Sequence, residues 1–188
     1  METEYKKLKA EEINTTFFQD FIRRQIVTRC WRLTEQGWVV LDAPFIDDWS
    51  QEDYRYLSAC LINTLNTGGV VFGFFEDGKL KGFASVEGTP LGSRSQYLDL
   101  SSLHVSADKR GQGIGRRLFQ LAAGWAQEHG AEKLYISGHS AVETQAFYKA
   151  MGCVEAAEYN PDHVEKEPFD CQLEFPLSAR RIWMKGLR

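Results

Sequence analysis

The segment at residues 109–119, KRGQGIGRRLF, places three glycines and four positive charges between two apolar stretches of different periodicity. Before it, residues 95–105 have the character of a strand, and after it, residues 113–129 repeat apolar residues at helical spacing. The first N–H groups of a helix lack intrahelical partners and carry the positive end of its dipole. Because glycine has no Cβ, such a backbone can approach an anion closely. The junction therefore suits a phosphate-binding loop, although a turn without function and a basic surface patch also fit it.

The glycine spacing argues against the common nucleotide-binding motifs. A Walker loop requires GxxxxGK[ST], which the sequence lacks. Gly111, Gly113 and Gly115 are spaced GxGxG, and Arg116 stands where the third glycine of a dinucleotide-binding fingerprint would fall. That fingerprint also needs an acidic residue closing a second strand about 20 residues further on, where this sequence predicts a helix.

Composition bounds the class of protein. The chain has 188 residues, a formal net charge of −4 and 43% apolar residues, which suits one folded domain over residues 1–188. The acidic balance argues against a general nucleic-acid binder. No signal sequence or bilayer-spanning apolar stretch is evident, so we expect a cytoplasmic protein with no membrane partner. The four cysteines form no zinc-type spacing, which predicts reduced thiols and no metal site: Cys30, Cys60, Cys153 and Cys171.

The order of apolar patterns and turn signals predicts an α/β layer architecture. Asp77-Gly78 is a strong hairpin signal, Ser50 with Asp53 and Ser140 with Glu143 fit capping boxes, and Gly152 fits a helix stop. Residues 35–49 read as irregular, and we favour a frayed end for the basic tail at 178–188 over a packed segment or an interface. The expected strands lie at 4–9, at 70–87 on both sides of the hairpin, and at 95–105, 132–137, 153–159 and 169–176; the expected helices lie at 15–32, 51–66, 113–129 and 140–151.

Two motifs together carry a resemblance to a known family. The run Arg110 to Gly115, RGQGIG, resembles the R/Q-x-x-G-x-G/A signature of the GCN5-related N-acetyltransferase (GNAT) superfamily. Downstream, LYISGHSAVETQAFYKAMGC is similar to that family's strand, helix and terminal F-Y-x-x-x-G motif. The close match covers about residues 97–153, and the rest agrees mainly in element order. The resemblance implies a mixed, mostly antiparallel central sheet with a splayed strand pair and helices on both faces.

The resemblance also implies a cosubstrate and its binding residues. In this family the loop holds the pyrophosphate of acetyl-CoA through backbone N–H groups, and the preceding strand offers backbone groups to the pantetheine arm. Leu103 and Val105 occupy the strand positions, and Ser140 can substitute for an Asn that many members carry where this chain has Ala141. Thr144 stands where a small Ala is common. The loop positions that match are Arg110, Gln112, Gly113, Ile114, Gly115 and Arg116.

The F-Y-x-x-x-G motif implies a general acid. Tyr148 falls at the position from which the family protonates the leaving CoA thiolate. A phenol of pKa ~10 carries its proton at neutral pH, so the role is chemically sensible. Phe147 is about 100° away on the helix and can face the core. The alternative is that both are ordinary core aromatics.

An ammonium substrate must lose a proton before it can attack, which calls for a base. Asp99 is our first candidate, because strand alternation puts it on the face of Leu103 and Val105 if no bulge intervenes. Glu87 is the second, and His104 points to the other face, where a structural role is expected. The N-terminal part is expected to form the wall for the amine, with these aromatic and acidic residues: Trp31, Trp38, Trp49, Asp47 and Asp48.

These patterns predict an acetyl-CoA-dependent N-acetyltransferase that transfers the acyl group directly to an unidentified primary amine. A catalytically silent acyl-CoA-binding or sensing module of the same fold is the first alternative. A structural interaction protein whose glycine turn is only a turn is the second. A homodimer is also open on the sequence.

Overall fold

The computed structural model describes residues 2–177, so the basic tail at 178–188 lies outside the described residues. Sixteen elements follow one another in the described chain: β1 (Thr3–Lys7), η1 (Ala10–Glu12), β2 (Arg24–Thr34), β3 (Gly37–Asp48), α1 (Gln51–Asn66), β4 (Val70–Glu76), β5 (Lys79–Val86), β6 (Tyr97–Asp99), β7 (Ser102–Val105), η2 (Ala107–Lys109), α2 (Ile114–Glu128), β8 (Lys133–Gly138), α3 (Val142–Met151), β9 (Val154–Glu155), α4 (Pro161–Lys166) and β10 (Cys171–Pro176).

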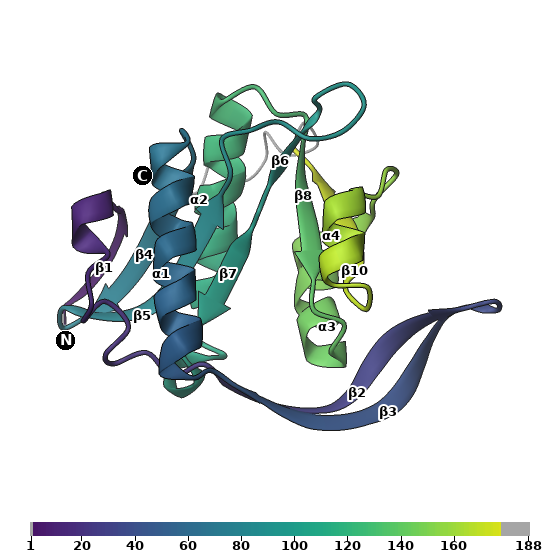
Figure 1. Ribbon diagram of the computed structural model, residues 1–188, viewed down its shortest axis with the longest axis horizontal. Helices are drawn as coiled ribbons and strands as arrows, with labels where there is room; N and C mark the ends of the chain where they lie inside the picture. Colours follow the sequence, from purple (N-terminus) through teal and green to yellow (C-terminus); the bar gives the residue numbers. More distant parts are fainter. Residues whose placement is uncertain (1, 178–188) are drawn as a thin grey trace.

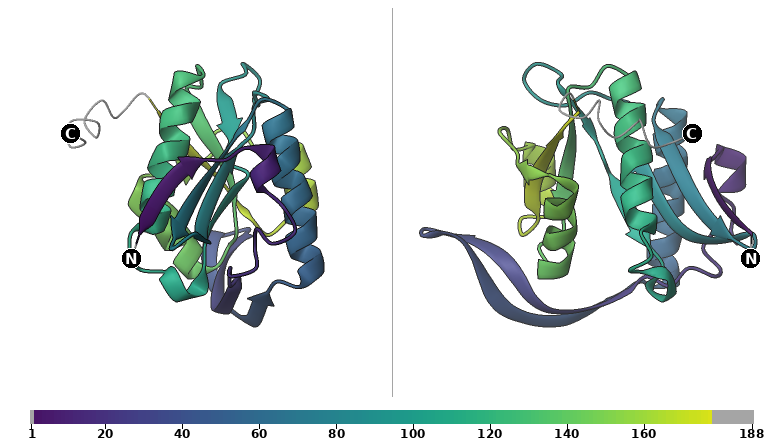
Figure 2. Two further views of the ribbon diagram at one scale, coloured as in Figure 1. Left: turned by 90° about the vertical axis from the view of Figure 1, so that its left-hand side faces the viewer. Right: turned by 180° about the vertical axis from the view of Figure 1, so that it is seen from behind.

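One half of the molecule is an antiparallel sheet in the order β1-β4-β5-β7, with a helix on each face. Figure 2 shows α1 and α2 on opposite sides of this sheet. Val71, Leu80 and Phe83 pack with Leu61 of α1, whereas Ala84 and Val86 pack with Leu118 of α2. Strand alternation thus gives the sheet two apolar faces, and the expected helices on both faces are confirmed.

The other half is the sheet β6-β8-β10-β9, in which β6 and β8 run parallel. Leu134 and Ile136 on one face of β8 join the core formed with α2 and α3. On the opposite face Tyr135 packs on Tyr97, and its ring stacks on His163 of α4 at 5.6 Å between centroids. One face of β8 therefore packs against the core with α2 and α3, and the other packs against β6 and α4.

The two sheets are joined by the stretch that the sequence predicted as one strand at 95–105. It is broken at Leu100 and Ser101 into β6, which pairs with β8, and β7, which pairs with β5. At this break Leu100 N still donates to Tyr135 O of β8, at 2.9 Å. Beyond it β7 and β8 diverge, as Figure 1 shows, so the predicted splayed strand pair is confirmed.

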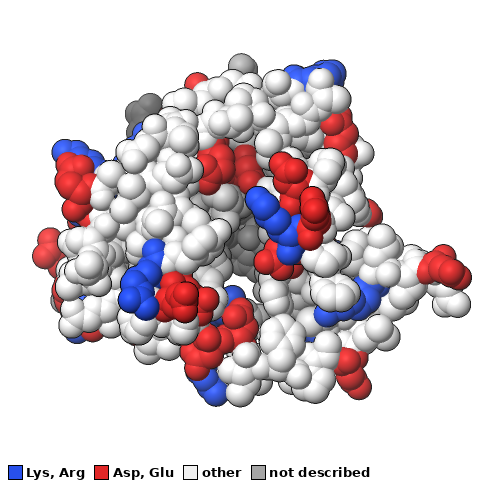
Figure 3. Space-filling model, in the orientation of Figure 1, with Lys and Arg blue, Asp and Glu red and all other residues white. Residues whose placement is uncertain are grey.

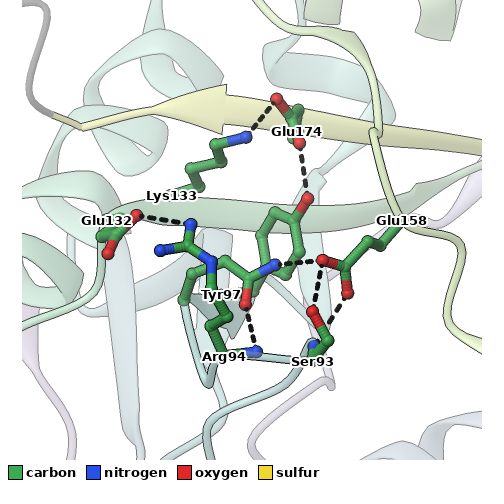
Figure 4. A network of polar contacts seen from close by, with 8 residues as sticks. Ser93, Arg94, Tyr97, Glu132, Lys133, Glu158 and Glu174 are labelled. Carbon is green, nitrogen blue, oxygen red and sulfur yellow. Dashed lines mark hydrogen bonds and ion pairs between the residues drawn. The ribbon is translucent and has the colours of Figure 1, made fainter.

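A polar network holds the joined end of the two sheets (Figure 4). Tyr97 Oη donates to Glu174 at 2.6 Å, and Lys133 Nζ donates to the other oxygen of the same carboxylate at 2.7 Å. Burial and then the Glu174 hydrogen bond raise the pKa of Tyr97 to about 12. Glu158 accepts from the backbone N and the hydroxyl of Ser93 at 2.8 and 2.7 Å. The network holds the two sheets together at the end near Tyr97, so β7 and β8 separate at the opposite end.

The prediction of a helix at 15–32 and of irregular structure at 35–49 is wrong. Residues 24–48 form the long β2–β3 hairpin, which pairs Ile26 with Ile46 and Trp31 with Val40. The apolar spacing that suggested a helix belongs to successive turns that place Phe18 and Phe21 in the α1 core. From Ile26 onward β-branched residues favour extended backbone, and their pairing partners come later in the chain.

The hairpin crosses from the first half of the molecule to the second, as Figures 1 and 2 show. Trp31 N donates to Ser140 O at 2.8 Å, and the backbones of Cys30 and Ala141 form an isolated antiparallel β-bridge. Arg32 Nη1 donates to Ser140 Oγ at 2.6 Å, and its guanidinium lies 4.7 Å from the ring of Phe169. These contacts attach the hairpin to the second half beside α3.

The remaining helices and strands mostly agree with those predicted from the sequence. The strand expected at 4–9 is present as β1, the helix at 51–66 is present with its Ser50 cap, and helix 113–129 begins one residue later. The Asp77-Gly78 hairpin is confirmed, with φ of 48° and 77°. The Ser140 capping box is wrong, because Ala141 is the N-cap of α3 and no side chain caps it. The strand expected at 153–159 shrinks to β9, and α4 follows it, capped by Asn160.

Among the described residues, no helix is both long and apolar enough to cross a membrane.

Candidate active site

A cleft of about 990 Å³ opens where β7 and β8 diverge. Its walls come from β7, the loop before α2, the end of β8 and α3. The end of the β2–β3 hairpin nearest the first sheet, here called the hairpin foot, adds Gln25, Phe45 and Asp47, and the segment before β10 adds Glu167 and Asp170. In Figure 3 the hollow lies between the two halves, with acidic side chains gathered around its rim. Segments far apart in the sequence therefore meet around one cavity.

The glycine loop forms one end of this cleft. Gly111 and Gly113 have φ of 78° and 81°, a left-handed conformation that favours glycine. Gly113 is the N-cap of α2 and carries no side-chain cap, and its carbonyl accepts the N–H of Arg117 at 3.1 Å. The N–H groups of Ile114, Gly115 and Arg116 come before that first bond, so their donors stay available to an anion.

Helix α2 meets the cleft closely because small residues stand where it touches its neighbours. A Cβ on Gly115 would lie 3.4 Å from the Phe147 ring and 3.5 Å from Val105. A Cβ on Gly82 of β5 would lie 2.9 Å from Ile114. The first turn of α2 is thus held against β7, β5 and α3, which aims its unpaired N–H groups at the cavity.

Most of the residues that the sequence assigned to the cosubstrate line this cleft. They are Leu103, Val105, Arg110, Gly113, Ile114, Gly115 and Arg116. Gln112 and Ser140 do not line it: Gln112 is exposed, and Ser140 is buried with its hydroxyl bonded to Arg32. The cofactor roles of these residues stay predictions, and the geometry brings all but two of them together.

Strand β7 presents a free backbone edge to the cavity. It pairs with β5 through Gly82 opposite Val105 and Ala84 opposite Leu103, and it is the last strand of its sheet among the described residues. Its other edge faces the space where β8 has diverged. Unpaired N–H and C=O groups of such an edge are ready partners for an extended chain that carries amides.

Tyr148 lines the cleft from α3 and is buried. Burial, followed by the nearby Cys153, Asp170 and Asp99, raises its pKa above that of a free phenol. The side chain therefore keeps its proton over the physiological range and can donate it. Phe147 packs on Phe119 in the α2 core as expected, although it also reaches the cavity wall.

Asp99 lies in surroundings that the sequence did not suggest. The prediction that Asp99 shares a strand face with Leu103 and Val105 is wrong, because the break at Leu100 and Ser101 interrupts the alternation of side chains along the strand. Leu98 and Leu100 pack in the α2 core with those two residues, whereas Asp99 points to the opposite face and is buried. There its Oδ2 lies 2.7 Å from His163 Nε2, and it does not line the cleft.

The other candidate bases are also placed. Glu87 accepts hydrogen bonds from Thr64 and Ser101 at 2.7 and 2.6 Å and lies outside the cleft lining. His104 does line the cleft, with its ring 4.8 Å from that of Trp49. Burial, followed by the charges of Arg23 and Arg110, lowers the pKa of His104 to about 3, so it is neutral at physiological pH.

The wall that the sequence analysis expected from N-terminal helices is formed by the hairpin foot. Trp49 and Asp47 line the cleft, whereas Trp31, Trp38 and Asp48 do not. Asp47 accepts from Arg23 Nη2 at 2.6 Å, and the buried Arg23 guanidinium lies 5.1 Å from the Trp49 ring. This arrangement fixes one wall of the cavity.

Sequence reasoning missed the polar residues that the remaining walls contribute. Asp170, which precedes β10, is the most perturbed of them: burial and then the Glu167 charge raise the pKa of its carboxyl to about 6. No sequence signal gave these side chains a role, because segments far apart in the chain bring them to the cleft. The missed polar lining residues include Arg23, His139, Glu167 and Asp170, and the apolar Phe45 lines the cleft with them.

Comparisons with known proteins agree with this geometry. The family model described as "Acetyltransferase (GNAT) family" matches residues 29–153. Comparison with curated protein sequences finds no match.

Solved structures of similar fold cover nearly the whole chain. Nourseothricin acetyltransferase has a TM-score of 0.65 and 18% identity, over 94% of this chain and 99% of that one. A protein assigned as a streptothricin acetyltransferase from Bacillus anthracis, in complex with acetyl coenzyme A, has a TM-score of 0.64 and 17% identity, over 93% and 96%. The PaiA N-acetyltransferase from Thermoplasma acidophilum, in complex with coenzyme A, gives 0.59 and 17%, over 94% and 99%.

Proposed function

Because the chain belongs to the acetyltransferase (GNAT) family and is an N-acetyltransferase, we propose that it transfers an acetyl group directly from acetyl-CoA to a primary amine. One observation carries the proposal. The uncapped N-terminus of α2 and the phenol of Tyr148 line the same cleft, at the place where the two sheets separate. An anion-binding loop and a proton donor are the two parts that a CoA thioester needs.

The residues present fit acetyl-CoA. Backbone N–H groups from Gly113 to Arg116 would bind the pyrophosphate, since they form the unpaired positive end of a helix. Among the described residues, a Cβ built on Gly111 or Gly113 would have no atom within 4 Å apart from those of adjacent residues, so the loop leaves open space on its outer side. The free edge of β7 at Leu103 and Val105 would bind the pantetheine amides, which directs the thioester into the splay.

The chemistry follows from these positions. The amine attacks the thioester carbonyl, whose oxygen gains charge that a β7 backbone N–H can stabilise. Tyr148 donates its proton to the departing sulfur, because burial keeps the phenol protonated until then. Cys153 is not needed as a nucleophile, since direct transfer forms no acyl-enzyme.

The charge around the cleft supports a cationic acceptor. Asp47, Glu143, Glu167 and Asp170 line it, and Figure 3 shows acidic side chains around its mouth. Carboxylates attract an ammonium and orient it toward the carbonyl. The names of the similar structures add nourseothricin and streptothricin as acceptors worth assaying.

Two measurements test the proposal. Calorimetry should show 1:1 binding of acetyl-CoA, and a thiol-release assay should show turnover with at least one amine of a panel. The panel contains nourseothricin, spermidine, L-lysine, glucosamine, tyramine and a peptide with a free N-terminus. Binding without thiol release would favour the silent acyl-CoA-binding module, and absence of binding would contradict both readings.

A further inference from the structure

We propose that Asp170 accepts the proton that the acceptor amine loses during acetyl transfer. The inference rests on the proposed function and deepens it, since it assigns the base. Asp170 lines the cleft together with Tyr148. The family's sequence pattern indicated Tyr148 but not Asp170. Three features of the described residues carry the assignment: the face on which Asp170 lies, the chain of hydrogen bonds that leads to its neighbour Ser137, and the charges around it.

The first feature is the position of Asp170 relative to Tyr148 across the end of β8. A Cβ on Gly138 would lie 3.2 Å from the Tyr148 ring, so Gly138 faces α3. Ser137 precedes it and faces the other way, toward α4, where it lines the cleft with Asp170 and lowers the pKa of that carboxyl. The acid and the carboxylate thus stand on opposite sides of one strand end, both in the cleft. The base can then contact the attacking nitrogen while the acid contacts the departing sulfur, because these two atoms are different substituents of the same carbonyl carbon.

The second feature is a chain of hydrogen bonds with one direction. Asn160 N donates to Tyr135 Oη at 2.8 Å, and Tyr135 Oη donates to Gln172 Oε1 at 2.5 Å. Gln172 Nε2 then donates to Ser137 Oγ at 3.0 Å, so the hydroxyl proton of Ser137 is directed away from Gln172. The chain thus runs toward the part of the cleft where Ser137 lowers the pKa of the Asp170 carboxyl. Such chains polarise and fix their members, which positions the carboxylate without occupying all of its lone pairs.

The third feature is the set of charges that faces Asp170 from the elements around it. Burial and Glu167 raise its pKa to about 6, while Ser137, His163 of α4 and Arg32 of β2 act in the opposite direction. At pH 7 the group is therefore ionised, yet it is a stronger base than an ordinary carboxylate. That balance is what a general base at neutral pH requires.

The proton balance of the step can be written in full. The ammonium gives one proton to Asp170, and the free lone pair forms the C–N bond to the thioester carbonyl carbon. The C–S bond then breaks, and the sulfur takes the proton of Tyr148. The second proton of the nitrogen restores the Tyr148 phenol, and Asp170 releases its proton to solvent. The products are the N-acetyl amide, CoA thiol and one proton.

The experiment compares Asp170→Asn with the wild type, using whichever panel amine turns over fastest. We expect kcat to fall by roughly 100-fold or more, with the Kd for acetyl-CoA unchanged. The wild-type profile of kcat/KM should fall on the acid side with an apparent pKa near 6, and Asp170→Asn should lack this limb. Ser137→Ala removes a hydroxyl that lowers the Asp170 pKa, so its acid limb should move to higher pH.

Two controls separate the outcomes. Glu165→Gln removes an exposed carboxylate of α4 that does not line the cleft, and it should keep wild-type values. Asp99→Asn tests the base that the sequence suggested. The assignment of Asp170 is overturned if Asp170→Asn keeps kcat within about threefold, or if its acid limb persists while Asp99→Asn loses it. Failure of the proposed function would instead appear in the wild type, as no thiol release with any amine, and the assignment would fall with it.

Discussion

The two ends of the cleft are built by different means. The end that we propose for the cosubstrate comes from one continuous stretch, β7 through the first turn of α2, and it offers backbone groups that glycines expose. The end that we propose for the acceptor is assembled from the hairpin foot, the end of β8 and the segment before β10, and it offers side chains. A backbone site is indifferent to most side chains, so it can serve one fixed cosubstrate. A side-chain site drawn from several segments can change its acceptor without disturbing the first.

The largest effect should come from closing the cosubstrate end. Gly113→Glu puts bulk and negative charge where the pyrophosphate is expected, and we predict that the Kd for acetyl-CoA rises by about 100-fold or more. Gly130→Glu is a matched control, because Gly130 also has a positive φ, 85°, and no atom within 4 Å of a built Cβ. Calorimetry measures both. Undiminished affinity in Gly113→Glu would break the distinction between the two ends.

Removal of the acid should come next. Tyr148→Phe keeps the packing of α3 but takes away the donated proton, so kcat should fall by about 100-fold while the Kd for acetyl-CoA stays the same. Because burial holds the Tyr148 pKa above its usual value, the loss should be equal across the neutral range. Tyr56→Phe, at a side chain that is 75% exposed, is the control. Turnover unchanged at every pH would show that the phenol is not the acid.

The same contrast explains what could be read from the sequence. The loop, its glycines and Tyr148 are close together in the chain, and their chemistry follows from local rules about helix ends and positive φ. The break at Leu100 and Ser101 could not be read, because it depends on β6 and β7 choosing different partners. One displaced residue there turned Asp99 to the face opposite the one expected.

The hairpin was missed for a similar reason. Turns at residues 14–21 bury Phe18 and Phe21 with a spacing that imitates a helix, and the strand pairing that competes with it joins residues up to 24 positions apart. Asp170 lies in no motif, and it comes near Ser137 of β8 only when β10 pairs with β8. Long-range pairing therefore decided every part of the acceptor end.

The acceptor end should also be visible in stability. Burial raises the pKa of Asp170 to about 6 from an ordinary value near 4, so the folded state resists ionisation and loses stability as the pH rises from about 4 to about 6. Asp170→Asn should relieve this, increasing the free energy of unfolding by about 2 kcal/mol at pH 7.5 and by almost nothing at pH 4. Denaturant titrations at both pH values measure it, with Glu165→Gln as the control. An equal change at both values would mean that Asp170 ionises without cost.

A smaller effect is expected where the hairpin is attached to the second half. Arg32→Ala removes the hydrogen bond to Ser140 Oγ and the contact with the Phe169 ring. The hairpin foot should then position the amine less well, raising the acceptor KM by about fivefold without changing the Kd for acetyl-CoA. Arg29→Ala, on the exposed side of the same strand, should change neither. A change in cosubstrate affinity instead would show that the two ends are coupled through the hairpin.

The smallest effect should be that of Ser140→Ala on cosubstrate binding. The sequence assigned Ser140 to acetyl-CoA, but its hydroxyl accepts from Arg32 Nη1 at 2.6 Å and it lies outside the cleft lining. We therefore expect the Kd for acetyl-CoA to stay within about twofold, because a hydroxyl held by a charged donor offers little to a second partner. A tenfold loss in Ser140→Ala that Arg32→Ala does not reproduce would place the hydroxyl on the cosubstrate after all. A loss shared by both variants would mean that the hydroxyl acts only through the hairpin, to which its bond with Arg32 attaches it.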